Sequence, residues 1–178
     1  MYTVEYEKFV LENGLNVILH EDKTLPLIAV NVWYHVGSKN EEIGKTGFAH
    51  LFEHLMFKGT KRHPTGTFDR EMESRGSETN AATWVDWTYY TEALVNSEGN
   101  FEAVVAFETD RMTGLILDET TFRSELEVVK NERRQSYEDR PYGMVWLRFF
   151  DSLYPKGHPY DHTPIGSHED LTAATLDD

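Results

Sequence analysis

Strand-like patterns of apolar and polar residues occupy the first part of the chain. Short apolar runs at 4–11 and 16–20 are joined around Asn13-Gly14, a dipeptide that accepts the positive φ values of a tight hairpin. A third run, 27–36, is rich in Val, Ile and aromatic residues, which predicts a well-buried strand. Residues 79–95 are dense in Thr, Val, Trp and Tyr and therefore predict two more strands.

Helical spacing of apolar residues appears after the third strand. Between 47 and 58, apolar side chains recur every three or four positions, and Gly59 follows as a stop signal. The same spacing, with breaking residues at the ends, predicts further helices over 67–75, 98–115, 119–138 and 143–154. Residues 157–166, with two Pro and two Gly, indicate an ordered loop.

No internal repeat, low-complexity tract or linker divides the sequence, so residues 1–178 are expected to form one domain. Strands and helices together predict an α/β fold of the α+β kind, with an antiparallel or mixed sheet and helices packed on it. Strand order does not follow from the pattern. Ser167 has the character of a helix N-cap and stands close to Asp178, which favours a domain that is truncated at its C-terminus.

The amino-acid composition excludes some classes of function and some kinds of metal ligand. The chain has 31 Asp plus Glu against 17 Lys plus Arg, and its net charge of -14 argues against a nucleic-acid partner. There is no Cys, so a transition metal would have to be held by His, Asp or Glu. No apolar run reaches the roughly 18 residues of a membrane span and no signal peptide is present, which predicts a soluble chain of the cytoplasm or the periplasm.

Candidate metal chemistry lies in the sequence His50-Leu51-Phe52-Glu53-His54. Two imidazoles four residues apart project from one face of a helix and can reach one ion, and neutral imidazole suits zinc. A carboxylate beside the ion, such as Glu53, can accept the proton of a water molecule. The alternative interpretation is a helix that carries two solvated histidines and one glutamate.

Two later carboxylates could complete such a site. Glu125 and Glu132 stand seven residues apart and share the apolar face of the predicted helix 119–138. A carboxylate that faces a core needs a proton, a hydrogen bond or a cation, and zinc with two neutral imidazoles lacks an anionic ligand. Periodicity does not choose between the two carboxylates. It also leaves open that they form ion pairs with neighbouring arginines, namely Arg123, Arg133 or Arg134.

With these residues the chain resembles a known family, the inverted zinc peptidases of the pitrilysin, insulysin and mitochondrial processing peptidase group. The resemblance rests on HLFEH followed by LMFKGT, on the two downstream glutamates, on GSETNAATWVDWTYY at 76–90 and on GHPYDHTPIG at 157–166. It implies that zinc is bound by His50, His54 and Glu132. It further implies Glu53 as the general base, Glu125 as a supporting carboxylate and a substrate-binding strand at Asn80, Ala81 and Ala82.

The resemblance also implies an activity and partners. The expected function is that of a zinc metalloendopeptidase, which cleaves a peptide substrate with a homologous second half of the chain or a partner subunit closing over the zinc domain. An oligomer is compatible with this arrangement, and an isolated fragment is expected to be weakly active or inactive. Two alternatives stay open: a non-catalytic structural or assembly relative, and a fragment that binds zinc without activity.

The remaining aromatic and histidine residues are assigned to structure. The cluster of Trp84, Trp87, Tyr89 and Tyr90 is expected in the core. Other histidines have no partner at ligand spacing and are expected to be exposed or hydrogen-bonded. These are His20, His35, His63, His158, His162 and His168.

Overall fold

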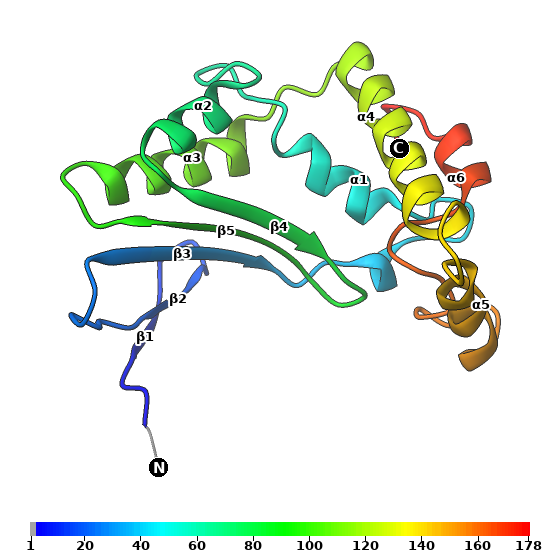
Figure 1. The fold of residues 1–178 in the computed structure, drawn as a ribbon, viewed down its shortest axis with the longest axis horizontal. Helices are drawn as coiled ribbons and strands as arrows, with labels where there is room; N and C mark the ends of the chain where they lie inside the picture. Colours follow the sequence, from blue (N-terminus) through cyan, green and yellow to red (C-terminus); the bar gives the residue numbers. More distant parts are fainter. Residues whose placement is uncertain (1–2) are drawn as a thin grey trace.

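The computed structural model describes residues 3–178, so the first two residues of the predicted domain 1–178 lie outside the described part. Its main sheet has three antiparallel strands in the order β3 (Leu27–Tyr34), β5 (Thr88–Val95), β4 (Glu78–Thr83). Three helices lie over one face of this sheet (Figure 1), namely α1 (Phe48–Leu55), α2 (Thr67–Ser74) and α3 (Asn100–Gly114). This arrangement confirms the predicted fold class.

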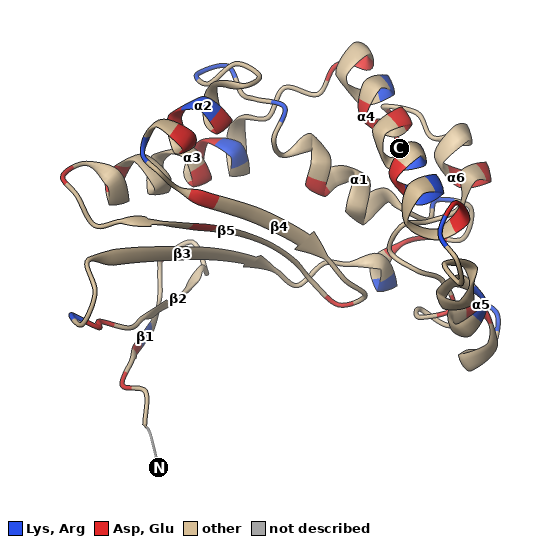
Figure 2. Ribbon diagram, viewed as in Figure 1, with Lys and Arg blue, Asp and Glu red and all other residues tan. Residues whose placement is uncertain are grey.

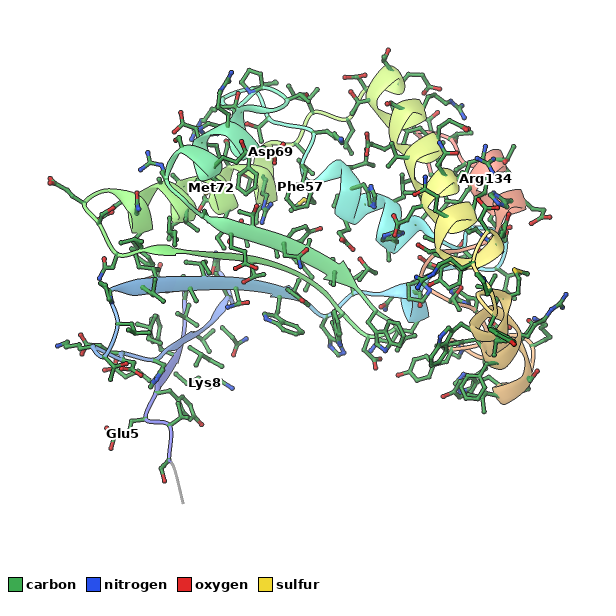
Figure 3. The ribbon with its side chains drawn as sticks, viewed as in Figure 1. Glu5, Lys8, Phe57, Asp69, Met72 and Arg134 are labelled. Carbon is green, nitrogen blue, oxygen red and sulfur yellow. The ribbon has the colours of Figure 1, made fainter. Side chains whose placement is uncertain are left out.

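The first two predicted strands form a separate hairpin, β1 (Glu7–Val10) with β2 (Asn16–Leu19). The backbone N–H of Gly14 donates to the carbonyl oxygen of Leu11 over 2.9 Å, and Gly14 has a φ of 88°. Because glycine adopts positive φ without steric cost, the chain reverses within three residues. The hairpin, with Lys8 on β1 and Glu5 just before this strand, extends away from the helices (Figure 3).

The prediction of a well-buried third strand is wrong. β3 is an edge strand, its residues alternate between exposed and half-buried, and Trp33 is 58% exposed. In residues 3–178, helices cover only one face of the sheet, so alternate residues point to the open face whatever their polarity. An apolar run identifies a strand but not how many of its faces are covered.

The same alternation divides the aromatic cluster that was expected in the core. Tyr90 points to the helices and is 1% exposed, whereas Tyr89 points to the open face and stacks on Trp33 with 4.8 Å between ring centroids. Trp84, at the end of the hairpin between β4 and β5, is 45% exposed. The core assignment is therefore right for Tyr90 and wrong for Trp84.

One core cluster lies between the sheet and the helices α2 and α3. Met72 and Phe57 are in this layer (Figure 3), and Met72 is almost fully buried. The buried members of this cluster are Phe68, Met72, Leu94, Val104 and Phe107. Burial of these side chains fixes α2 and α3 on the sheet.

A second core cluster joins α1 to the long helix α4 (Glu119–Arg133), which crosses beside it (Figure 1). α4 begins at Asp118, whose side chain accepts the N–H of Thr121, and continues into a wide turn at Arg134–Glu138. The helices α5 (Met144–Leu153) and α6 (His168–Ala173) follow, and Ser167 caps α6 as predicted. The buried members of this cluster are Leu51, Leu55, Phe122, Leu126, Val129, Ile165, Leu171 and Ala174.

Acidic and basic residues both occur along α4, whereas the three-stranded sheet carries few charged residues (Figure 2). In residues 3–178, no helix combines the length and the apolarity that a bilayer crossing requires. Among these elements, α1 is held on one side by the sheet and on the other by α4, and its position fixes the candidate site.

Candidate metal centre

Helix α1 brings the two candidate histidines together. Leu51 and Leu55 are buried against α4, and this fixes the rotation of the helix so that His50 and His54 project from a neighbouring face. The Nε2 atoms of the two rings lie 3.3 Å apart. The prediction that one helix face presents both imidazoles is confirmed.

The distant helix α4 adds Glu132 to this pair. Its Oε2 atom lies 3.4 Å from Nε2 of His54 and 3.7 Å from Nε2 of His50. Among the described residues, these three side chains form the group whose ligand atoms all lie within 4.8 Å of one another. The side chain of Glu132 is 42% exposed, so the group opens to solvent on its carboxylate side.

The arrangement has the chemistry of a cation site. Three atoms with lone pairs face one another at 3.3 to 3.7 Å, and without a shared cation or proton they would repel. Ligand atoms that surround a tetrahedral zinc ion at about 2.0–2.1 Å lie roughly 3.3–3.4 Å apart. The donor set of two imidazole nitrogens and one carboxylate oxygen also suits zinc, so the residues present fit this ion.

Protonation of the three residues is unequal. Burial lowers the pKa of His50 to about 4, so this ring is neutral at physiological pH and has a free lone pair. Burial also disfavours the charged form of His54, but the hydrogen bond and the charge of Glu132 outweigh it and raise the pKa of His54. The hydrogen bond with His54 in turn lowers the pKa of Glu132, which keeps this carboxylate ionised. A cation and a proton would therefore compete for the pair of His54 and Glu132.

Glu53 lies on the same helix between the two histidines and is partly buried. Thr83 of β4 donates its hydroxyl hydrogen to Oε2 of Glu53. Burial raises the pKa of Glu53, and the hydrogen bond from Thr83 and the charge of His54 oppose this only in part. A carboxylate with a raised pKa, held at one oxygen and free at the other, has the properties of a general base.

Glu125 is buried two turns before Glu132 on α4, with 5% of its side chain exposed. Its Oε1 atom lies 2.9 Å from Nζ of Lys58, and its Oε2 atom lies 3.6 Å from Nδ1 of His54. The alternative of ion pairs between these carboxylates and the arginines of α4 is wrong. In the described chain Arg123 pairs with Glu119, Arg133 with Glu138, and Arg134 binds Asn131.

Asn80, Ala81 and Ala82 lie on β4, which among the described residues is the edge strand of the main sheet next to α1. The N–H of Trp84 donates to the carbonyl oxygen of Trp87, and because bonded pairs alternate along antiparallel strands, Ala82 and Asn80 also bond to β5. The main-chain groups of Ala81 then face the free edge. The side-chain oxygen of Asn80 accepts the N–H of Ala81 over 2.9 Å.

Two residues that contact the candidate site, Thr83 and Lys58, are not among the site residues that the sequence predicts. Thr83 is brought there by tertiary structure, 30 positions from Glu53, and Lys58, in the turn that follows α1, contacts Glu125 of α4. Lys58 stands four residues after His54, so helical spacing alone could have placed it on the same face.

A family profile and two curated relatives place the chain among the same group of peptidases. Residues 16–148 match the family profile described as insulinase (peptidase family M16). The chain is 40% identical to "Zinc protease PqqE" of Helicobacter pylori, over 99% of this chain and 39% of the relative. It is 30% identical to "Probable mitochondrial-processing peptidase subunit beta" of Schizosaccharomyces pombe, over 97% of this chain and 37% of the relative.

A solved structure shows the same fold. The crystal structure of a protease from Helicobacter pylori superposes with a TM-score of 0.94 at 39% identity, over 99% of this chain and 42% of that one. The chain thus spans about two fifths of the length of the relatives that it matches.

Proposed function

Since the chain belongs to the insulinase family of peptidases, family M16, we propose that it carries the zinc site and the general base of a metalloendopeptidase. The observation that carries this proposal is the convergence of His50, His54 and Glu132, from two separate helices, to ligand-atom distances of 3.3 to 3.7 Å. Relatives named as zinc proteases support the choice of metal. The activity is proposed for the complete protein.

In this proposal His50, His54 and Glu132 hold the zinc ion, and Glu125 keeps the ring of His54 in place from its Nδ1 side. When bound, zinc supplies Lewis-acid chemistry, which acidifies water and polarises a carbonyl oxygen. Glu132 is the anionic ligand, and its lowered pKa keeps it ionised for this role.

Glu53 moves the proton. Because Thr83 donates to its Oε2 atom, its Oε1 atom is free to accept a proton from the water that attacks the scissile carbonyl carbon. Glu53 then gives this proton to the leaving amine as the C–N bond breaks, which yields a shortened peptide with a new carboxylate and a new amine. The raised pKa of Glu53 favours both halves of this transfer near neutral pH.

The free edge of β4 positions the peptide. An extended peptide that adds as a further strand would pair with the outward main-chain groups of Ala81, beside Glu53 and Thr83. Asn80 and Ala82 support this edge through their bonds to β5, and Asn80 also controls access to the N–H of Ala81. A homologous second half or a partner subunit is proposed to enclose the substrate, in line with the length of the relatives.

The substitution Glu53→Gln in the complete gene product tests the function. It keeps the shape of the side chain but removes the base, so peptide cleavage should fall by roughly 10²- to 10⁴-fold while zinc stoichiometry stays unchanged. Glu127→Gln, on an exposed glutamate of α4, is the matched control and should leave cleavage intact. Unchanged peptide cleavage in Glu53→Gln would show that Glu53 is not the general base. Zinc binding by a wild-type protein that cleaves no peptide would favour a non-catalytic relative.

A further inference from the structure

We propose that His162 and Glu41 are positioning residues, which fix the start of α1 so that its histidines meet Glu132. The inference rests on the proposed function, because its purpose is the geometry of the zinc ligands. It assigns a role to the loop at 157–166, which the mechanism above does not use.

Glu41 caps the helix that carries the ligands. Gly47, at the start of α1, has no side chain that could accept the free N–H groups of the first turn. Glu41 does this from outside the helix: its Oε2 atom accepts the N–H of Gly47 over 2.9 Å, and its Oε1 atom accepts the N–H of Ala49 over 2.8 Å. Ala49 directly precedes His50, so this carboxylate holds the helix immediately before the first ligand.

His162 neutralises that carboxylate. The side chain of Glu41 is only 4% exposed, and a buried carboxylate needs a counter-charge. Nε2 of His162 lies 3.0 Å from Oε2 of Glu41 and 3.0 Å from the carbonyl oxygen of Ser38, while its Nδ1 lies 3.1 Å from Oδ1 of Asp161. All three partners are acceptors, so both ring nitrogens carry hydrogen and His162 is a cation. The hydrogen bond with Glu41 correspondingly raises the pKa of His162 to about 9.

The segment that follows His162 makes a second set of contacts with the start of α1. Asp170 accepts the N–H of Thr46 over 2.9 Å and its hydroxyl hydrogen over 2.6 Å, and the N–H of Ser167 donates to that hydroxyl over 3.0 Å. Gly166 passes so close to α1 that an added Cβ would lie 2.4 Å from the carbonyl oxygen of Thr46. The loop and α1 are therefore in direct backbone contact.

The loop also contacts α4 next to the third ligand. Nε of Arg133, the residue after Glu132, donates to the carbonyl oxygen of Gly166 over 3.0 Å. Ile165 and Leu171 pack into the core cluster between α1 and α4. One segment thus joins the start of the helix with the two histidines to the end of the helix with the glutamate.

This junction bears on metal binding because a zinc site tolerates errors of only about 0.2 Å in its ligand distances. His50 is three residues, just under one helical turn, beyond the capped N–H of Gly47, and a small tilt of α1 would move its Nε2 away from Glu132. Without the cation at His162, Glu41 would be an uncompensated buried carboxylate beside the first turn of α1. We therefore expect the pair to control zinc affinity without touching the ion.

Zinc affinity of the complete gene product, measured by competition with a chromophoric chelator, tests the inference. His162→Gln and Glu41→Gln should each weaken zinc binding by about 10-fold or more, and the double variant should weaken it by much less than the product of the two. The matched control is His63→Gln, which also breaks a His–carboxylate pair, the one with Asp110, but leaves α1 capped. It should bind zinc as the wild type does.

Two further measurements separate positioning from loss of folding. The visible absorption of the cobalt-loaded protein should change in His162→Gln and not in His63→Gln, because it reports ligand geometry. If His162→Gln fails to fold, Thr46→Val, which removes only the hydroxyl contacts with Asp170 and Ser167, takes its place and should weaken zinc binding in the same direction. Wild-type zinc affinity in the folded loop variants would overturn this inference and leave the proposed function intact, whereas a wild-type protein without zinc affinity would overturn the proposed function.

Discussion

Thr83 donates its hydroxyl hydrogen to Glu53 across 30 positions of sequence, from the edge strand β4 to the helix α1. This bond ties the proposed general base to the strand on which the peptide is proposed to lie. It also favours the ionised form of Glu53, and so opposes the burial that raises the pKa of this carboxyl group.

Removal of that hydroxyl in Thr83→Val should impair catalysis most at acidic pH. Without the hydrogen bond the pKa of Glu53 rises further, so a smaller fraction of the enzyme holds the base ionised. We expect kcat/KM at pH 6 to fall by roughly 3- to 10-fold, the net value of one ordinary hydrogen bond, with a smaller loss at pH 8. Thr83→Ser keeps the donor and should restore the acidic limb of the pH profile. An equal loss at both pH values would contradict the proposed effect on Glu53.

The edge of β4 predicts a contrast between two neighbouring proline substitutions. Proline lacks an N–H group, and the N–H of Ala81 faces the free edge while that of Ala82 bonds to β5. Ala81→Pro should therefore preserve the fold, as measured by circular dichroism, and raise KM for peptides. Ala82→Pro should instead destabilise the protein by about 3 kcal/mol in urea unfolding. Equal effects of both substitutions on KM and stability would argue against strand addition at this edge.

A buried charge cluster on the inner face of the sheet predicts a pH dependence of stability. Arg111 binds both Glu108 and Glu92, over 2.9 and 3.1 Å, and all three side chains are buried. Burial, together with the neighbouring Glu108, raises the pKa of Glu92 from 4.5 to about 8. The folded state thus binds a proton that the unfolded state has released, a stabilisation that is complete below pH 4.5 and is lost as pH rises through 8.

Urea unfolding of the wild type and of Glu92→Gln between pH 5 and 8.5 measures this effect. The amide stays neutral, so the variant should lose less stability with rising pH, by roughly 3 to 4 kcal/mol over this range. Glu78→Gln, at an exposed position of β4, is the control and should follow the wild-type curve. Parallel curves for Glu92→Gln and the wild type would show that Glu92 does not take up this proton.

Local patterns predicted the elements because each depends on residues close in sequence. Helix α1 follows from apolar spacing and Gly59, and α6 from the N-cap at Ser167, whose side chain accepts the N–H of Asp170. The burial of β3 could not be predicted in the same way, because it depends on which faces of the sheet the helices cover. Trp33 is apolar and belongs to a strand, but it points to the open face.

The candidate site was likewise predicted only in part from residues close in sequence. Spacing of four residues gives the pair of His50 and His54, but it leaves Glu125 and Glu132 equivalent. They differ because α1 and α4 run antiparallel: Lys58 and His54 meet Glu125, while His54 and His50 meet Glu132. That alignment is a tertiary property. The contact between His162 and Glu41, 121 positions apart, is likewise invisible to local spacing.

Zinc stoichiometry and affinity, measured for the purified wild type, Glu132→Ala and Glu125→Ala, show directly whether the three side chains form a zinc site. We predict one zinc ion per chain in the wild type, and a loss of affinity of at least about 100-fold in Glu132→Ala that exceeds the loss in Glu125→Ala. Zinc binding by Glu132→Ala with wild-type affinity would contradict this prediction.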